Sequence, residues 1–101
     1  MSGARPDLSV ALEAYLGYRE HSFPGSHWDA VVAALGLVRA QEVEVPMLGV
    51  LADLDAIKPD WRLQSLDQAS EAAARAIRAR YADIDERAGK ALFWAYSYGY
   101  K

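Results

Sequence analysis

The longest regular pattern in the chain is an apolar repeat over residues 66–95. It opens with Ser65-Leu66-Asp67-Gln68, which has the spacing of a capping box: the serine hydroxyl and the glutamine side chain each accept a backbone N–H of the first turn. Apolar residues then recur every three or four positions, as on one helical face. They are Leu66, Ala69, Ala73, Ile77, Tyr81, Ile84, Ala88, Ala91 and Ala95. This pattern predicts one long helix, or two helices if the acidic residues at 83–86 and Gly89 interrupt it.

Three shorter helices are predicted in residues 7–58. The first starts near Asp7, a good N-cap, and ends before Phe23-Pro24-Gly25 because the residue ahead of a proline avoids the helical region. The second starts at the capping pattern of residues 26–29, and Gly36 weakens or ends it. The third starts at Pro46, which suits a first helical turn, and it stops at Lys58-Pro59.

These elements predict an all-α fold, a compact bundle of four to five helices. One short extended segment is expected near 42–45, where glutamate and valine alternate over too few residues to support a sheet. A chain of 101 residues has the size of one domain. Residues 1–101 are therefore assigned to a single helical domain, with residues 1–6 as a loose N-terminus.

Composition excludes several classes of protein. The absence of cysteine rules out disulfide scaffolds, thiolate zinc sites and cysteine nucleophiles. The chain begins without a signal-peptide pattern, and its longest uncharged run is 91–100, about half of the roughly 20 residues that span a bilayer. No glycine-rich phosphate loop or nucleophile motif is present. We therefore expect a soluble cytoplasmic protein that is not an enzyme, needs no cofactor and does not enter a membrane.

The C-terminal segment ALFWAYSYGYK alternates aromatic and small residues from Trp94 onward, which is also typical of a strand. A strand here would need a partner, and only residues 42–45 offer one, so a helix is favoured. Gly99 is then expected to end this helix in the left-handed conformation.

Phe93 and Trp94 do not fit the inner face of that helix. At about 100° per residue, they point toward its polar side, next to Glu86 and Lys90. Either another element covers them, such as the connector that carries Trp61 or the first helix, or they form an exposed apolar patch. On a soluble protein such a patch usually marks a binding site for a partner.

The function predicted from these features is stoichiometric binding of another protein, as in immunity proteins, antitoxins, adaptors and regulators, or self-association into a homo-oligomer. Residues 1–60 hold nine acidic and four basic residues, so the first half could meet a basic partner. The expected anchors are aromatic and the expected rim is acidic. The anchors are Phe93 and Trp94, with Trp61 and Tyr100 as neighbours, and the rim residues are Glu42, Glu44, Asp53 and Asp60.

A metal-dependent enzyme or metal-binding protein is one alternative. His21 and His27 flank a short turn, and Glu20 and Asp29 lie beside them. Imidazoles and carboxylates on one loop could hold a divalent ion such as zinc, although the spacing matches no recurrent set of ligands.

A helix-turn-helix DNA-binding regulator is the other alternative. Residues 75–90 include four arginines and a lysine. However, the arginines do not form one helical stripe, and the chain is net negative, whereas DNA affinity comes chiefly from neutralised phosphates. Nucleic acid is therefore the less favoured partner.

Overall fold

The computed structural model describes residues 5–100, and within this range the chain forms five α-helices and no strand. They are α1 (Asp7–Leu16), α2 (Trp28–Leu35), α3 (Leu37–Ala56), α4 (Leu66–Arg80) and α5 (Glu86–Gly99). The predicted all-α fold is confirmed. Residues 1–4, in the predicted loose N-terminus, lie outside the described residues.

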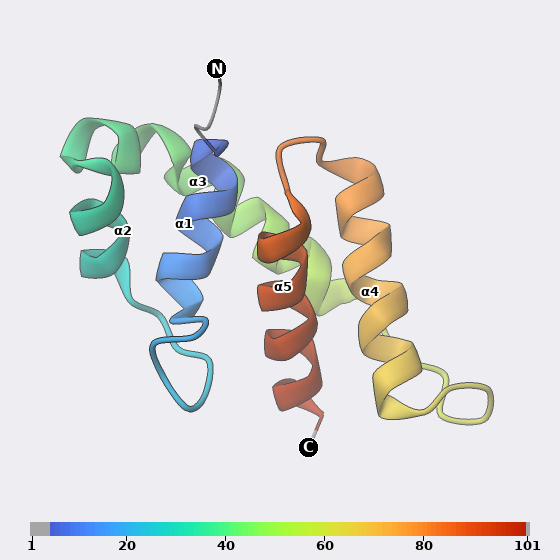
Figure 1. Cartoon of the computed structure of the whole chain (residues 1–101). Helices are drawn as coiled ribbons and strands as arrows, with labels where there is room; N and C mark the ends of the chain where they lie inside the picture. The colour runs from blue at the N-terminus through green and yellow to red at the C-terminus, as the bar shows by residue number, and fades with distance from the viewer. Residues whose placement is uncertain (1–4, 101) are drawn as a thin grey trace.

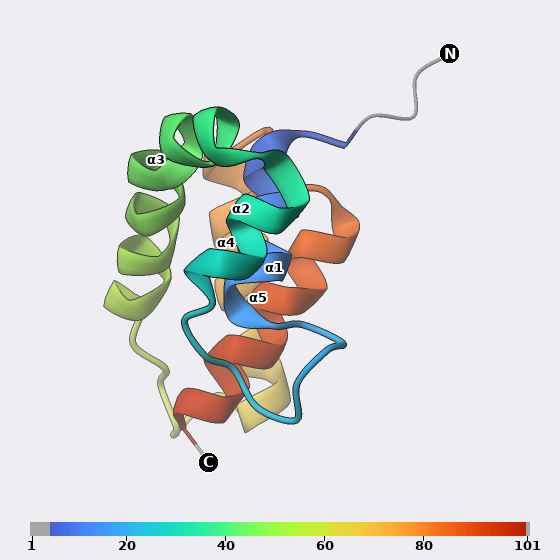
Figure 2. The ribbon, with the colours of Figure 1, turned by 90° about the vertical axis from the view of Figure 1, so that its left-hand side faces the viewer.

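Four of the helices lie side by side in the order α2, α1, α5 and α4, and α3 crosses behind them (Figure 1). The view turned by 90° places α3 along one side of the domain (Figure 2). The central helix α1 packs against α2, α3 and α5, and α4 packs against α5 and α3. Because α3 touches all four other helices, it ties the two halves of the layer together.

Each helix contributes at least one fully buried apolar side chain to the core. The fully buried apolar residues with the largest side chains are Leu12, Val31, Met47, Val50, Ile77 and Leu92. Burying a side chain of this size contributes about 1.5–3 kcal/mol to folding. The core is therefore one cluster shared by the five helices.

The prediction of an extended segment near 42–45 is wrong, because these residues lie inside α3. Val43 is buried and belongs to a helical stripe with Ala40 and Met47, whereas Val45 is 78% exposed. The alternation therefore contrasts the two faces of a helix. Pro46 lies within α3 rather than at its start. It has no N–H to donate to the carbonyl of Glu42, and because both residues are exposed that carbonyl can bond water instead.

Gly36 ends α2, as one of the two sequence interpretations held, and α3 begins at the next residue. Its φ of 82° belongs to a region that favours glycine, and this lets the chain turn sharply. The predicted cap at residues 26–29 is wrong: His27 is the N-cap, and no side chain accepts a hydrogen bond there. At α1, Pro6 rather than Asp7 occupies the N-cap position.

Helix α1 ends at Leu16, well before the proline that was expected to stop it. Gly17 adopts the left-handed conformation with a φ of 79°, and its N–H bonds the carbonyls of Glu13 and Ala14. Two backbone hydrogen bonds close the loop that follows by joining its end to the end of α1. The N–H of Gly25 donates to the carbonyl of Leu16 at 3.1 Å, and the N–H of His27 donates to the carbonyl of Tyr15 at 2.8 Å.

The capping box at Ser65 is confirmed by hydrogen bonds in both directions between Ser65 and Gln68, of 3.2 and 2.8 Å. The long apolar pattern forms two helices, separated at residues 81–85. Asp85 caps the second helix, α5. Gly99 is the last residue of α5 but is not left-handed, so that prediction is wrong; the C-cap is Tyr100, with a φ of −120°.

Candidate functional site

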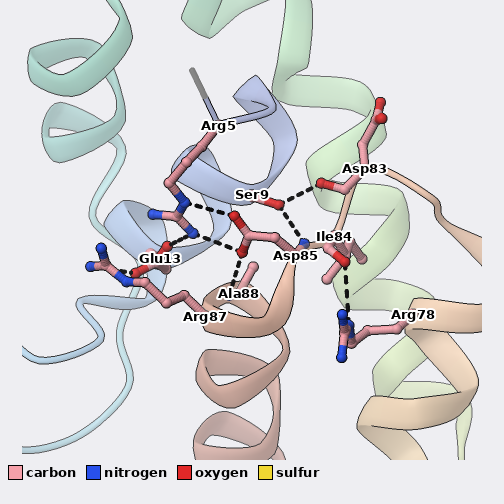
Figure 3. Close-up of polar contacts among 9 residues, drawn as sticks. All are labelled: Arg5, Ser9, Glu13, Arg78, Asp83, Ile84, Asp85, Arg87 and Ala88. Carbon is pink, nitrogen blue, oxygen red and sulfur yellow. Dashed lines mark hydrogen bonds and ion pairs between the residues drawn. The ribbon is translucent and has the colours of Figure 1, made fainter. Parts of the chain in front are cut away.

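A network of charged side chains joins α1 to the start of α5 (Figure 3). The Arg5 guanidinium donates two hydrogen bonds to the Asp85 carboxylate, at 2.6 and 2.8 Å, and forms an ion pair with Glu13. Glu13 is only 8% exposed, and its other oxygen lies 3.1 Å from a guanidinium nitrogen of Arg87. A carboxylate this deeply buried is costly unless it is paired, and two arginines pair it here.

Ser9 fixes the turn between α4 and α5 from the α1 side. Its fully buried hydroxyl donates to the carbonyl of Asp83 and accepts the N–H of Asp85 at 2.8 Å. From α4, Nε of Arg78 donates to the carbonyl of Ile84 at 3.3 Å. The turn is thus held on both sides, and this fixes how α5 lies against α4.

The pKa of the Asp85 carboxyl lies below its usual range, chiefly because Arg5 donates to it, and the N–H of Ala88 adds a further bond at 2.9 Å. Partial burial acts in the opposite direction but is outweighed. Because the folded-state pKa is depressed, the stabilisation is complete above the ordinary value of about 3.9 and disappears as the pH falls through the folded value.

The change Asp85→Asn keeps a good capping residue but removes the charge that Arg5 binds. We expect it to lower the free energy of unfolding by about 1 kcal/mol at a pH of about 6, and by less at a pH of about 2. Urea titrations at the two pH values measure the difference. In the control Asp83→Asn the changed carboxylate takes no part in the network, since only its backbone carbonyl does; a loss equal at both pH values for Asp85→Asn would contradict this account.

A groove of about 620 Å³ runs between α4 and α5 and is lined by Phe93 and Trp94. Its other aromatic residue is Tyr18, which follows α1 in the chain. The small buried residues Gly89 and Ser97 of α5 also line it, as does Ala74 of α4. The groove therefore combines an apolar, aromatic lining with small residues that leave space between the two helices.

Not every charged residue along the groove has an oppositely charged partner there. Arg75 pairs with Glu71 at 2.7 Å, and Lys90 pairs with Glu86 at 3.8 Å. Arg78 forms no ion pair with any carboxylate of residues 5–100. Its side chain lies over Gly89, where an added Cβ would be 2.7 Å from Cδ of Arg78. The absence of a side chain at residue 89 thus leaves room for this arginine beside the groove.

Phe93 and Trp94 are neither core residues nor fully exposed: both are half-buried at the edge of the core. The Trp94 ring contacts Tyr18, with ring centroids 5.6 Å apart, and Tyr98, at 6.0 Å. The segment after α1 therefore covers part of Trp94. The Trp61 connector does not take part in this contact.

The other two predicted anchors form a separate cluster. Trp61, which is 53% exposed, packs edge-on against Tyr100 at 5.7 Å. Tyr100 in turn packs on Tyr96, whose hydroxyl donates to the carbonyl of Ile57 at 2.7 Å. This cluster lies toward α3, whose residues Leu51 and Leu54 share a small cavity with the two tyrosines. The structure thus divides the four aromatic anchors into two pairs.

The acidic residues predicted to form a rim do not lie together either. Asp53 accepts a hydrogen bond from the hydroxyl of Tyr81 and lies 3.6 Å from Arg80. Asp60 bonds within its own turn, to the backbone and side chain of Arg62. Glu42 and Glu44 are on α3, away from the α4–α5 groove, and take part in no ion pair among the described residues.

The imidazoles of His21 and His27 are stacked, with ring centroids 4.0 Å apart and ring planes at 9°. The lone pairs of a stacked pair lie in two parallel planes, so the rings cannot direct them at one ion. Within residues 5–100 no group of three or more histidine and acidic side chains could hold a metal, and Glu20 and Asp29 are exposed. This arrangement gives the metal alternative no support.

Most of the basic residues behind the DNA-binding alternative already face carboxylates. Arg80 lies near Asp53, and Arg87 is paired with Glu13. Arg75 and Lys90 have partners along the groove, as described above. Few of these charges remain to neutralise phosphates, which is the main source of DNA affinity.

The polar network could not be predicted from the sequence, because its partners are distant in the chain: Arg5 and Asp85 are 80 residues apart. Comparison with protein-family models, curated proteins and solved structures finds no match. Among the described residues, no helix combines the length and apolar character needed to cross a membrane.

Proposed function

We propose that this chain is a small cytoplasmic domain that works by stoichiometric binding of a partner protein, and that the α4–α5 groove is its binding site. The observation that carries this proposal is the pair Phe93 and Trp94, half-buried beside an open groove rather than sealed in the core. Tryptophan and tyrosine are enriched among the residues that contribute most to binding energy.

The charges along the groove indicate what the partner would present. Arg78 lies beside the aromatic residues and has no ion-pair partner among residues 5–100. A guanidinium binds a carboxylate through two parallel hydrogen bonds. We therefore expect the partner to insert an apolar side chain next to Trp94 and to place an aspartate or glutamate near Arg78.

Selection of a displayed random-peptide library on the immobilised domain tests this. The selected peptides should share an apolar anchor and a nearby acidic residue, and they should bind one to one. Trp94→Ala should weaken their binding by about tenfold or more, because it removes the largest ring in the groove. Fluorescence anisotropy measures the affinity, and far-ultraviolet circular dichroism checks that the helices remain.

The matched control is Trp61→Ala, which removes an exposed tryptophan outside the groove and should leave the affinity unchanged. A second variant, Arg78→Gln, should lower the affinity for acidic peptides several-fold, and it does so without removing an aromatic ring. If Trp94→Ala unfolds the domain, Trp94 is a core residue and the proposal fails. It fails equally if the selected peptides bind both tryptophan variants alike.

A further inference from the structure

Helix α3 exposes an apolar face directly opposite its buried side. Val38 is 69% exposed, Val45 is 78% exposed and Leu48 is 43% exposed. At about 100° per residue, Val38 and Val45 point roughly 180° away from the buried stripe that contains Met47. These three residues, with exposed Ala52, are called the outer face of α3 below.

The spacing along the outer face is seven, three and four residues, as at the a and d positions of a two-stranded coiled coil. The outer face runs from Val38 to Ala52, past Pro46, and at 1.5 Å per residue it is therefore about 21 Å long. A ridge with this repeat and length fits a second helix that packs along it at a shallow angle. An extended strand or a single side chain would not follow the repeat.

Acidic residues flank the outer face on both sides. Helix α3 holds four acidic residues and one basic residue, Arg39, which pairs with Asp7 of α1. On a helical wheel Glu42 lies on one flank of the apolar ridge, and Glu44 and Asp55 lie on the other. None of these three carboxylates forms an ion pair within residues 5–100. The ridge is thus an apolar stripe with acidic residues on both flanks. Glu42 also interacts electrostatically with Arg39, so the flank of Glu44 and Asp55 is the more negative of the two.

We propose that the outer face of α3 binds an amphipathic helix of a partner protein whose apolar stripe is flanked by lysine and arginine. Basic residues beside the stripe would meet the flanking carboxylates, as charges do beside the seam of a coiled coil. A second copy of this chain packed on the same face would place acidic flanks near each other. Anionic membrane surfaces and nucleic acids would be repelled in the same way. The inference does not depend on the α4–α5 groove.

The test uses a labelled helical peptide of about three heptads, with leucine at a and d and lysine at e and g. Its matched control peptide carries glutamate in place of every lysine. We expect the lysine peptide to bind the full chain one to one, with an affinity that falls as salt is raised, and the glutamate peptide not to bind. Fluorescence anisotropy at low and physiological salt measures both.

Two sets of variants test whether the lysine peptide binds at the outer face of α3. Val45→Ser should lower the affinity for the lysine peptide by about tenfold or more. Leu63→Ser changes a residue that is 79% exposed in the connector, and it should leave this affinity unchanged. Neutralising Glu42, Glu44 and Asp55 together should weaken binding and flatten its salt dependence. Neutralising three exposed acids elsewhere makes the same change in net charge and should have a smaller effect. These control positions are Glu20, Asp67 and Asp83.

Four outcomes would overturn the inference. They are no binding of the lysine peptide at low salt, equal binding of the glutamate peptide, an affinity indifferent to Val45→Ser, and sedimentation that shows a dimer lost on Val45→Ser. The last would assign the outer face to a second copy of the chain. Trp94 lines the α4–α5 groove and Val45 lies on α3, so the effect of Trp94→Ala on the groove peptides and the effect of Val45→Ser on the lysine peptide can fail separately.

Discussion

Replacing Leu12 by alanine should lower the free energy of unfolding by about 3 kcal/mol. Leu12 is fully buried in α1, the helix that packs against α2, α3 and α5 at once. Removing its side chain loses the transfer free energy of three buried carbons and leaves a cavity that three surrounding helices cannot close without moving. Stabilities of domains this size are about 5–15 kcal/mol, so the loss is a large fraction of the total.

Urea unfolding followed by circular dichroism measures this loss. Leu63→Ala is the matched control, because it removes the same atoms from a side chain that is 79% exposed in the connector; it should change stability by less than about 0.5 kcal/mol. A similar, small effect of the two changes would mean that α1 is not the centre of the core.

Replacing Gly17 by alanine should lower the free energy of unfolding by about 2 kcal/mol. Gly17 ends α1 with a φ of 79°, in the left-handed region, which costs an L residue about 1–2 kcal/mol. A Cβ there would also overlap the His21 ring and lie 3.0 Å from Cδ2 of His27. The His21 ring would have to shift, and this would disturb its stacking on His27.

Gly49→Ala gives the opposite expectation and so serves as the comparison. Gly49 lies inside α3, and an added Cβ there would meet nothing within 4 Å. Alanine in a helix interior is favoured over glycine by about 0.5–1 kcal/mol, so this variant should be more stable than the native chain. If both alanine variants shift the urea midpoint in the same direction, the conformation assigned to Gly17 is wrong.

Helix content and fold class could be predicted because they depend on local signals. The capping box at Ser65 and the three-and-four spacing after it are contained in adjacent residues, and both are confirmed. The short alternation at 42–45 misled the prediction because a helix surface also alternates over four residues when one valine is buried and the next exposed. Only the packing of α3 on the core distinguishes the two.

The division of the aromatic residues also required the tertiary structure. The sequence places Phe93 and Trp94 on the polar side of their helix, but it does not say that Tyr18 covers part of Trp94. Nor does it say that Tyr100 pairs with Trp61 on the side toward α3. These contacts join residues that are far apart in the chain, and a helical wheel holds no information about them.

What the sequence by itself determined is the all-α fold class, the capping box at Ser65 and the two aromatic residues that do not fit an inner face. Periodicity and capping are properties of neighbouring residues, and so they can be read before the chain folds. Three features are decided by the tertiary structure alone. Arg5, Ser9 and Glu13 hold the turn before α5, and Arg78 lies over Gly89 beside the groove. Helix α3 exposes an apolar ridge that is flanked by acidic residues. Each of these depends on how the helices pack against one another, and packing is fixed by contacts between residues distant in the chain.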